Sequence, residues 1–195
     1  MATRAVLIQA GPTPWDVEGR IVGNSSLPLT AEAVDAIRHR LEEIPAPIDS
    51  VYRAAGNEAC NQVAQMIARK HELRPRNRPD LDEVRLGLWQ GLLPDDVRAR
   101  FPTVFRQWEE QPLSVTPPDG EMLQQAIGRI KTALVKIIRR NKDHTIVLPL
   151  RPMALQIARG VLRLQSSCQI AEHLRERQAA ETIEIDPEAI KALLD

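Results

Sequence analysis

Six charged residues follow short apolar runs of this sequence, at positions where their side chains could bind a ligand or take part in catalysis. Grouped guanidinium groups bind oxyanions such as phosphate, whereas carboxylates transfer protons or bind a hard cation through oxygen. No cation-binding spacing joins the carboxylates, so no metal is expected. We expect the arginines to neutralise the carboxylates rather than to form a new anion site, because an uncompensated buried carboxylate is costly. The carboxylates are Asp16, Glu58 and Glu83, and the arginines are Arg20, Arg53 and Arg151.

The elements that must position these residues alternate between apolar runs and amphipathic segments. Such an order predicts an α/β fold, a three-layer α/β/α domain with a mostly parallel central sheet covered on both faces. The carboxyl ends of parallel strands then line any binding site. The predicted strands are 5–9, 48–52, 145–148 and 182–185, and the predicted helices are 30–44 with Thr30 as its cap, 57–71, 94–111, 122–140 and 153–164.

The composition indicates one domain over residues 1–195, because 43% of the residues are hydrophobic, enough for one substantial core. The aromatic segment at about 92–120 is expected to form a small helical cap. The 26 basic and 26 acidic residues cancel, so neither nucleic acid nor a membrane is an expected partner. Without a leader or a long apolar run, a cytoplasmic protein is expected. Cys60 and Cys168 lack a metal-site or disulfide spacing, so both are interpreted as buried or inert thiols.

Several short motifs occur in one order along most of the chain. The first reads Gln9-Ala10-Gly11, then Trp15-Asp16, Gly19-Arg20 and Pro28-Leu29-Thr30. Later come Gly87-Leu88-Trp89-Gln90-Gly91-Leu92, Phe101-Pro102 to Trp108, and Pro117-Pro118-Asp119-Gly120-Glu121. In order and spacing, residues 5–164 resemble the histidine phosphatase (phosphoglycerate mutase-like) superfamily. The resemblance implies the phosphoglycerate mutase-like fold and phosphoryl-transfer chemistry without a cofactor.

The family's chemistry requires a histidine nucleophile, two arginines and a second histidine that clamp the phosphate, and a carboxylate that handles the leaving-group proton. By the resemblance, the two histidine positions fall on Ala10 and Leu150, and the two arginine positions fall on Gln9 and Glu58. The family carboxylate is retained as Glu83. An alanine cannot attack phosphorus, so the resemblance implies a degenerate pocket.

Two further pocket positions are occupied by charged residues. Arg20 matches the family, and Asp16 replaces its asparagine. Glu58 puts a negative charge where the family has a positive one. At about 4 Å and an effective dielectric constant near 20, a pair of like charges costs about 4 kcal/mol. Phosphate is therefore expected to be excluded.

These substitutions favour a catalytically inactive pseudoenzyme, a binding, scaffold or regulatory protein with an unknown protein partner or with self-association. The alternative is a phosphatase or mutase that uses relocated residues, Glu83 with Arg53 or Arg151. In either case a carboxylate oxygen of Glu58 or Glu83 is predicted within about 4 Å of the guanidinium group of Arg20, Arg53 or Arg151, the usual ion-pair limit.

Overall fold

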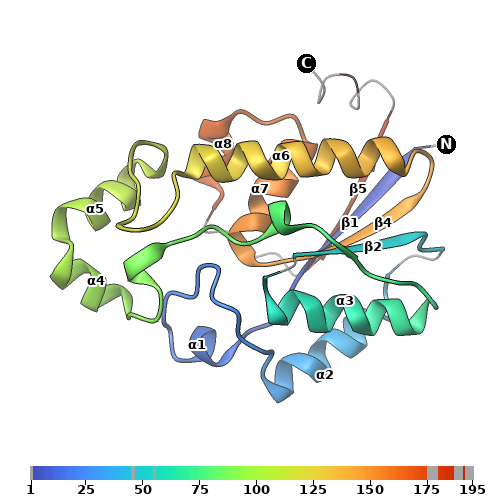
Figure 1. Cartoon of the computed structure of the whole chain (residues 1–195), viewed down its shortest axis with the longest axis horizontal. Helices are drawn as coiled ribbons and strands as arrows, with labels where there is room; N and C mark the ends of the chain where they lie inside the picture. Colours follow the sequence, from blue (N-terminus) through green and yellow to red (C-terminus); the bar gives the residue numbers. More distant parts are fainter. Residues whose placement is uncertain (1, 45–46, 55, 175–179, 187–190, 192–195) are drawn as a thin grey trace.

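A five-stranded sheet forms the centre of the molecule, in the order β3-β2-β4-β1-β5 (Figure 1). The computed structural model describes residues 2–44, 47–54, 56–174, 180–186 and 191. Four strands are parallel, and β5 pairs antiparallel with β1. The strands are β1 (Thr3–Gln9), β2 (Ser50–Arg53), β3 (Arg76–Asn77), β4 (Thr145–Leu150) and β5 (Ala180–Ile185). The predicted α/β fold with a mostly parallel sheet is confirmed.

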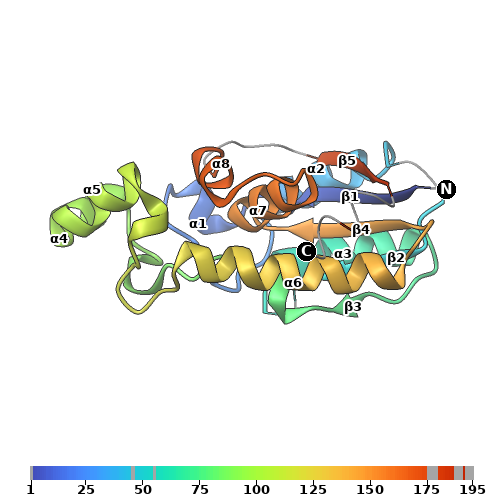
Figure 2. The ribbon, with the colours of Figure 1, turned by 90° about the horizontal axis from the view of Figure 1, so that it is seen from above.

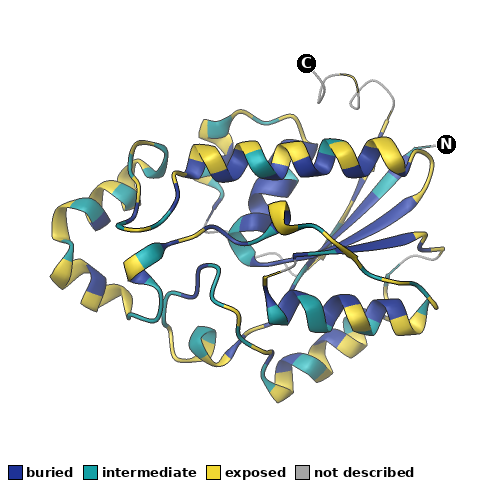
Figure 3. Cartoon of the chain, viewed as in Figure 1, coloured by how far each residue is buried: buried dark blue, intermediate teal, exposed yellow. Residues whose placement is uncertain are grey.

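Helices cover both faces of this sheet. Two views show α6, α7 and α8 on one face and α2 and α3 on the other (Figures 1 and 2). Most residues of β1, β2 and β4 and the inward sides of the helices are buried, while the outward sides of the helices are exposed (Figure 3). These helices are α2 (Ala31–Arg40), α3 (Glu58–Lys70), α6 (Leu123–Arg140), α7 (Pro152–Leu162) and α8 (Ser167–Glu172).

Local sequence explains why these elements form. All six residues of β4 are buried, which is typical of a strand covered by helices on both faces. The Thr30 hydroxyl accepts a hydrogen bond from the Ala33 N–H at 3.2 Å, so Thr30 caps α2 as predicted. Along α6, apolar residues at spacings of three and four, such as Ile130, Leu134 and Ile137, are fully buried.

A cap of short helices lies beyond the carboxyl ends of the strands (Figure 1). One helix was predicted over 94–111, but the chain forms α4 (Pro94–Arg100) and α5 (Pro102–Glu110), followed by the 3₁₀ helix η3 (Pro112–Ser114). The break falls at Phe101 because a residue before proline is disfavoured in helical conformation. The Trp89 ring packs edge to face against the Phe105 ring at a centroid distance of 5.3 Å and against the Trp108 ring at 5.8 Å, so these aromatic residues pack the cap.

The structure adds elements that the sequence did not predict. These are α1 (Pro14–Val17), α8, the 3₁₀ helices η1 (Pro79–Leu81) and η2 (Gly87–Trp89), and strand β3. Cys60 is buried, as one of the two predicted alternatives has it, whereas Cys168 is exposed on α8, and for Cys168 an inert thiol stays a prediction. Within the described part of the chain, we find no helix with the length and apolar character needed to cross a bilayer.

Candidate functional site

Two aliphatic residues lie side by side where β1 and β4 end. The Ala10 N–H donates a hydrogen bond to the Leu150 carbonyl at 2.8 Å, and the strand register pairs Gln9 with Leu150. Ala10 is 1% exposed and Leu150 is fully buried. The carboxyl ends of these parallel strands therefore converge as predicted. The two positions that the resemblance assigns to histidines hold groups without a lone pair.

An ion pair between Asp16 and Arg151 spans the same edge of the sheet. The Arg151 Nη2 atom lies 2.9 and 2.8 Å from the two carboxylate oxygens of Asp16. The Arg151 Nη1 atom also donates to the Gly11 carbonyl at 3.1 Å. The Arg151 side chain is only 3% exposed and that of Asp16 is 15% exposed, so the pair is largely shielded from water. Arg151 thus points inward, toward the loop after β1.

Thr13 completes the environment of Asp16. Its N–H and hydroxyl both donate to one Asp16 carboxylate oxygen, at 2.7 and 2.6 Å. Burial raises the pKa of Asp16, but the Arg151 charge and the Thr13 hydrogen bonds outweigh burial and hold the pKa below its ordinary value. Asp16 is therefore a charged structural link between the loop after β1 and the start of α7.

Glu83 lies against the N-terminus of α7. Its carboxylate accepts hydrogen bonds from the N–H groups of Met153 and Ala154, each at 2.9 Å, and from that of Val84 at 2.7 Å. The first N–H groups of a helix lack partners within the helix and attract negative charge, so Glu83 fills this position. Burial nevertheless raises the pKa of the Glu83 carboxyl, although these N–H groups and Arg151 oppose the rise.

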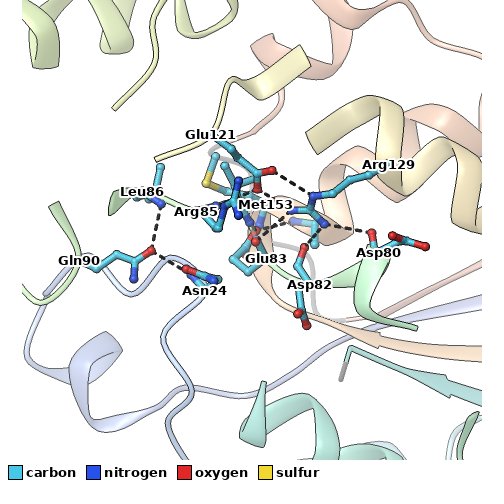
Figure 4. A network of polar contacts seen from close by, with 12 residues as sticks. Asn24, Asp80, Asp82, Glu83, Arg85, Leu86, Gln90, Glu121, Arg129 and Met153 are labelled. Atoms are coloured by element: carbon cyan, nitrogen blue, oxygen red, sulfur yellow. Dashed lines mark hydrogen bonds and ion pairs between the residues drawn. The ribbon is translucent and has the colours of Figure 1, made fainter. Parts of the chain in front are cut away.

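Arg129 on α6 fixes the segment that carries Glu83 (Figure 4). Its guanidinium group binds the Glu121 carboxylate at 2.6 and 3.1 Å. The same group donates to the carbonyl oxygens of Asp80, Asp82 and Glu83, at 3.0, 2.7 and 3.1 Å. Arg129 is a site residue that was not predicted, because its only signal in the sequence was its place on a helix.

The remaining predicted residues have other partners. Arg20 donates to the Gly91 carbonyl and to Glu18, at 2.7 and 2.6 Å. The Arg53 Nε atom donates to Asn77 on β3 at 2.5 Å. The Glu58 carboxylate accepts a hydrogen bond from the Asn61 amide at 3.0 Å.

The predicted ion pair of Glu58 or Glu83 with one of the three arginines is therefore wrong. In the part of the chain that the structure describes, neither carboxylate lies within 4 Å of those groups, and Asp16 takes Arg151 instead. The reason is geometric: the N-terminus of α7 supplies Glu83 with N–H donors, and Asn61 is one helical turn from Glu58. The expected neutralisation of a pocket carboxylate by an arginine holds for Asp16 and Arg151.

Two buried polar atoms of this region, Gln9 Oε1 and Arg151 Nε, have no hydrogen-bond partner among the residues that the structure describes. Gln9 is the last residue of β1 and is paired with Leu150, the last residue of β4, which Arg151 follows directly. The two atoms therefore belong to neighbouring ends of the sheet. Among the described residues, no group of three or more histidine, cysteine, aspartate or glutamate side chains is arranged to hold a metal ion.

Comparison with known proteins identifies the family to which this fold belongs. The sequence profile of the histidine phosphatase superfamily (branch 1) matches residues 5–158, most of the chain. The chain belongs to the histidine phosphatase superfamily. One relative in this superfamily, phosphoserine phosphatase 1 of Hydrogenobacter thermophilus, is 24% identical over 155 residues, which cover 77% of this chain and 74% of the relative.

Solved structures show the same superfamily fold. The alpha-ribazole phosphatase of Shigella flexneri superposes with a TM-score of 0.85 at 20% identity, covering 95% of this chain and 92% of that one. A mycobacterial glucosyl-3-phosphoglycerate phosphatase superposes with a TM-score of 0.78 at 18% identity, covering 88% and 84% of the two chains. At these identities the likeness shows the fold alone.

Proposed function

We propose that this chain is a non-catalytic member of the histidine phosphatase superfamily that acts by binding a partner protein or a second copy of itself. The observation that carries the proposal is the buried pair Ala10 and Leu150 at adjoining strand ends. Covalent phosphoryl transfer needs a nucleophile at this position. An alanine methyl group provides none, and the leucine beside it cannot clamp a phosphate.

The charges around this pair also support the proposal. Arg151 directly follows Leu150, one of the two positions that the resemblance assigns to histidines. Its guanidinium group donates hydrogen bonds to Asp16 and to the Gly11 carbonyl. Fixed cations that face the phosphoryl oxygens are usually the largest contribution to such catalysis. A guanidinium group already paired with a carboxylate offers much less positive charge to a phosphate.

The alternative function is phosphoryl transfer through Glu83 with Arg53 or Arg151. Its support is that a relative of the chain in Hydrogenobacter thermophilus is named a phosphoserine phosphatase, and that Arg151 Nε has no hydrogen-bond partner within the described part of the chain. Against it, Glu83 accepts three backbone hydrogen bonds, so its carboxylate is occupied in the folded protein.

Hydrolysis of para-nitrophenyl phosphate distinguishes the two functions. The purified chain should release no para-nitrophenol above the rate in buffer, with or without orthovanadate. The matched variants are Arg53→Gln, which removes a cation of the alternative site, and Arg38→Gln, which removes an exposed arginine of α2. Turnover that is inhibited by vanadate and lost in Arg53→Gln but not in Arg38→Gln would establish the alternative. Vanadate-sensitive turnover that Arg53→Gln does not affect would also refute the non-catalytic proposal.

A further inference from the structure

A cavity of about 530 Å³ lies between the cap and the α7–α8 face of the molecule. It is bounded by α5 and η3 on one side and by α8 and the first turn of α7 on the other (Figure 1). Its volume falls in the range of small-molecule sites, about 300–1,000 Å³. It contains none of the pocket residues assigned by the family resemblance, although Met153 lines it and donates its N–H to Glu83.

The wall of this cavity is largely apolar. Leu113 and Met153 are partly buried and Leu174 is buried, so their side chains give the wall an aliphatic surface. Trp108 adds an aromatic surface from α5. An apolar wall with a few polar groups at fixed places is the usual composition of a site for an organic ligand.

The charged side chains among the described lining residues are acidic. Glu109, Glu110 and Glu172 line the cavity, and none of the lining residues that the structure describes is an arginine, lysine or histidine. Glu109 has an ion-pair partner, Arg98, at 3.5 Å. In the described part of the chain, neither Glu110 nor Glu172 has a basic group within 4 Å. These two carboxylates come from the ends of α5 and α8, two helices that both line the cavity.

We propose that this cavity is a binding site for a small amphipathic organic cation, an amine or guanidine attached to an apolar body. The apolar body would contact Leu113, Met153 and Leu174, and the cation would lie between Glu110 and Glu172. The acidic wall disfavours the phosphate esters on which the superfamily acts, because like charges repel. The proposal does not depend on whether the old pocket is catalytic, so the two can fail separately.

Cys168 provides a reporter for occupancy. It lines the cavity and is exposed, whereas Cys60 is fully buried. Burial also raises the pKa of the Cys60 thiol, which keeps it in the unreactive protonated form. A thiol reagent should therefore modify Cys168 selectively, and a ligand in the cavity should slow that modification.

The test compares three ligands of similar shape, 4-phenylbutylamine, 4-phenylbutanol and 4-phenylbutanoate. Calorimetry should show the amine binding with a Kd of about 1 mM or tighter, as expected for a ligand of this size. The alcohol should bind about tenfold more weakly, and the carboxylate should not bind measurably. The amine should also slow the reaction of Cys168 with iodoacetamide.

Matched variants test the role of the two carboxylates. The double change Glu110→Gln and Glu172→Gln should weaken amine binding about tenfold and leave alcohol binding unchanged. The same change at Glu42 and Glu184, which are exposed and do not line the cavity, should have no effect. Ser114→Trp, at an exposed lining residue, should block both ligands.

Three results would overturn the proposal. The first is an absence of amine binding, and the second is equal binding of the amine and the alcohol. The third is amine binding that neither protects Cys168 nor responds to the glutamate substitutions. Sedimentation of the same variants identifies another occupant: dissociation of a dimer by Glu110→Gln and Glu172→Gln, without amine binding, would assign the cavity to a second copy of the chain and refute the cation site.

Discussion

The Nη2 atom of Arg151 lies within 2.9 Å of both carboxylate oxygens of Asp16, although the two residues are 135 positions apart in the sequence. The pair joins the start of α7 to the loop after β1. Through Glu83, which binds the N-terminus of the same helix, it connects to the segment held by Arg129. The charged groups at this edge of the sheet therefore hold loops together.

Replacing Asp16 with asparagine should lower the free energy of unfolding by about 3–5 kcal/mol. The change leaves the buried Arg151 guanidinium group without a counter-charge, which is the costly way to break a buried ion pair. Urea unfolding at pH 7 measures the effect. A loss below about 1 kcal/mol would show that the pair behaves like an exposed one.

The double change Asp16→Asn and Arg151→Met should be less destabilising than Asp16→Asn alone. Removing both charges also removes the cost of an uncompensated buried cation, and the asparagine can still accept a hydrogen bond from Thr13. Unfolding of the wild type, both single variants and the double variant completes a double-mutant cycle. Simple additivity of the two single effects would contradict the paired role of these residues.

Acid should reduce stability through Asp16. Its pKa in the folded protein lies below the ordinary value of 3.8, so its stabilising contribution is present above that value and is lost as the pH falls through the folded pKa. The stability difference between the wild type and Asp16→Asn should therefore be constant from pH 7 to pH 5 and shrink below about pH 4. Urea unfolding across this range checks the prediction. A difference that does not change down to pH 2.5 would count against the depressed pKa.

Arg129→Met should lower the free energy of unfolding by about 3 kcal/mol, because Glu121 is 4% exposed and would lose its counter-charge. The methionine keeps the apolar stem but none of the donors. Arg98→Met, which breaks the exposed pair with Asp95, is the control and should cost at most about 1 kcal/mol. Equal losses in the two variants would mean that Arg129 does not fix the Glu83 segment.

Ala10→His should not create phosphatase activity. The nucleophile and its phosphate clamp act as a unit, and their contributions are far from additive. Gln9, Glu58 and Leu150 would still stand at the other positions required by the family. Hydrolysis of para-nitrophenyl phosphate by the folded variant tests this. Appreciable turnover from this single change would reveal a clamp that survives in another form.

The sequence was sufficient for the fold because its signals are local. Apolar runs predicted β1, β2, β4 and β5, and Thr30 predicted the start of α2. The two-residue strand β3 was missed because its residues, Arg76 and Asn77, are exposed and polar and form a strand only by pairing with β2.

The partners of the charged residues could not be predicted from the sequence. The predicted partner of an arginine was Glu58 or Glu83, and only the path of the chain places Asp16 opposite Arg151. Glu83 instead meets the N–H groups of α7, whose start was predicted one residue late, at 153. Which carboxylate pairs with which arginine depends on tertiary geometry. Residue types and their spacing in the sequence do not specify that geometry.

We propose that the pocket at the ends of β1 and β4 does not bind phosphoryl groups, and equilibrium binding of orthovanadate tests this proposal. Isothermal titration of the wild-type chain with orthovanadate at pH 7.5 should give only heats of dilution at millimolar concentrations. The reason is that Arg151 is paired with Asp16, and that Ala10 and Leu150 occupy the positions that the resemblance assigns to histidines. Saturable binding that is abolished by Arg151→Met, in a variant shown to be folded, would contradict the account.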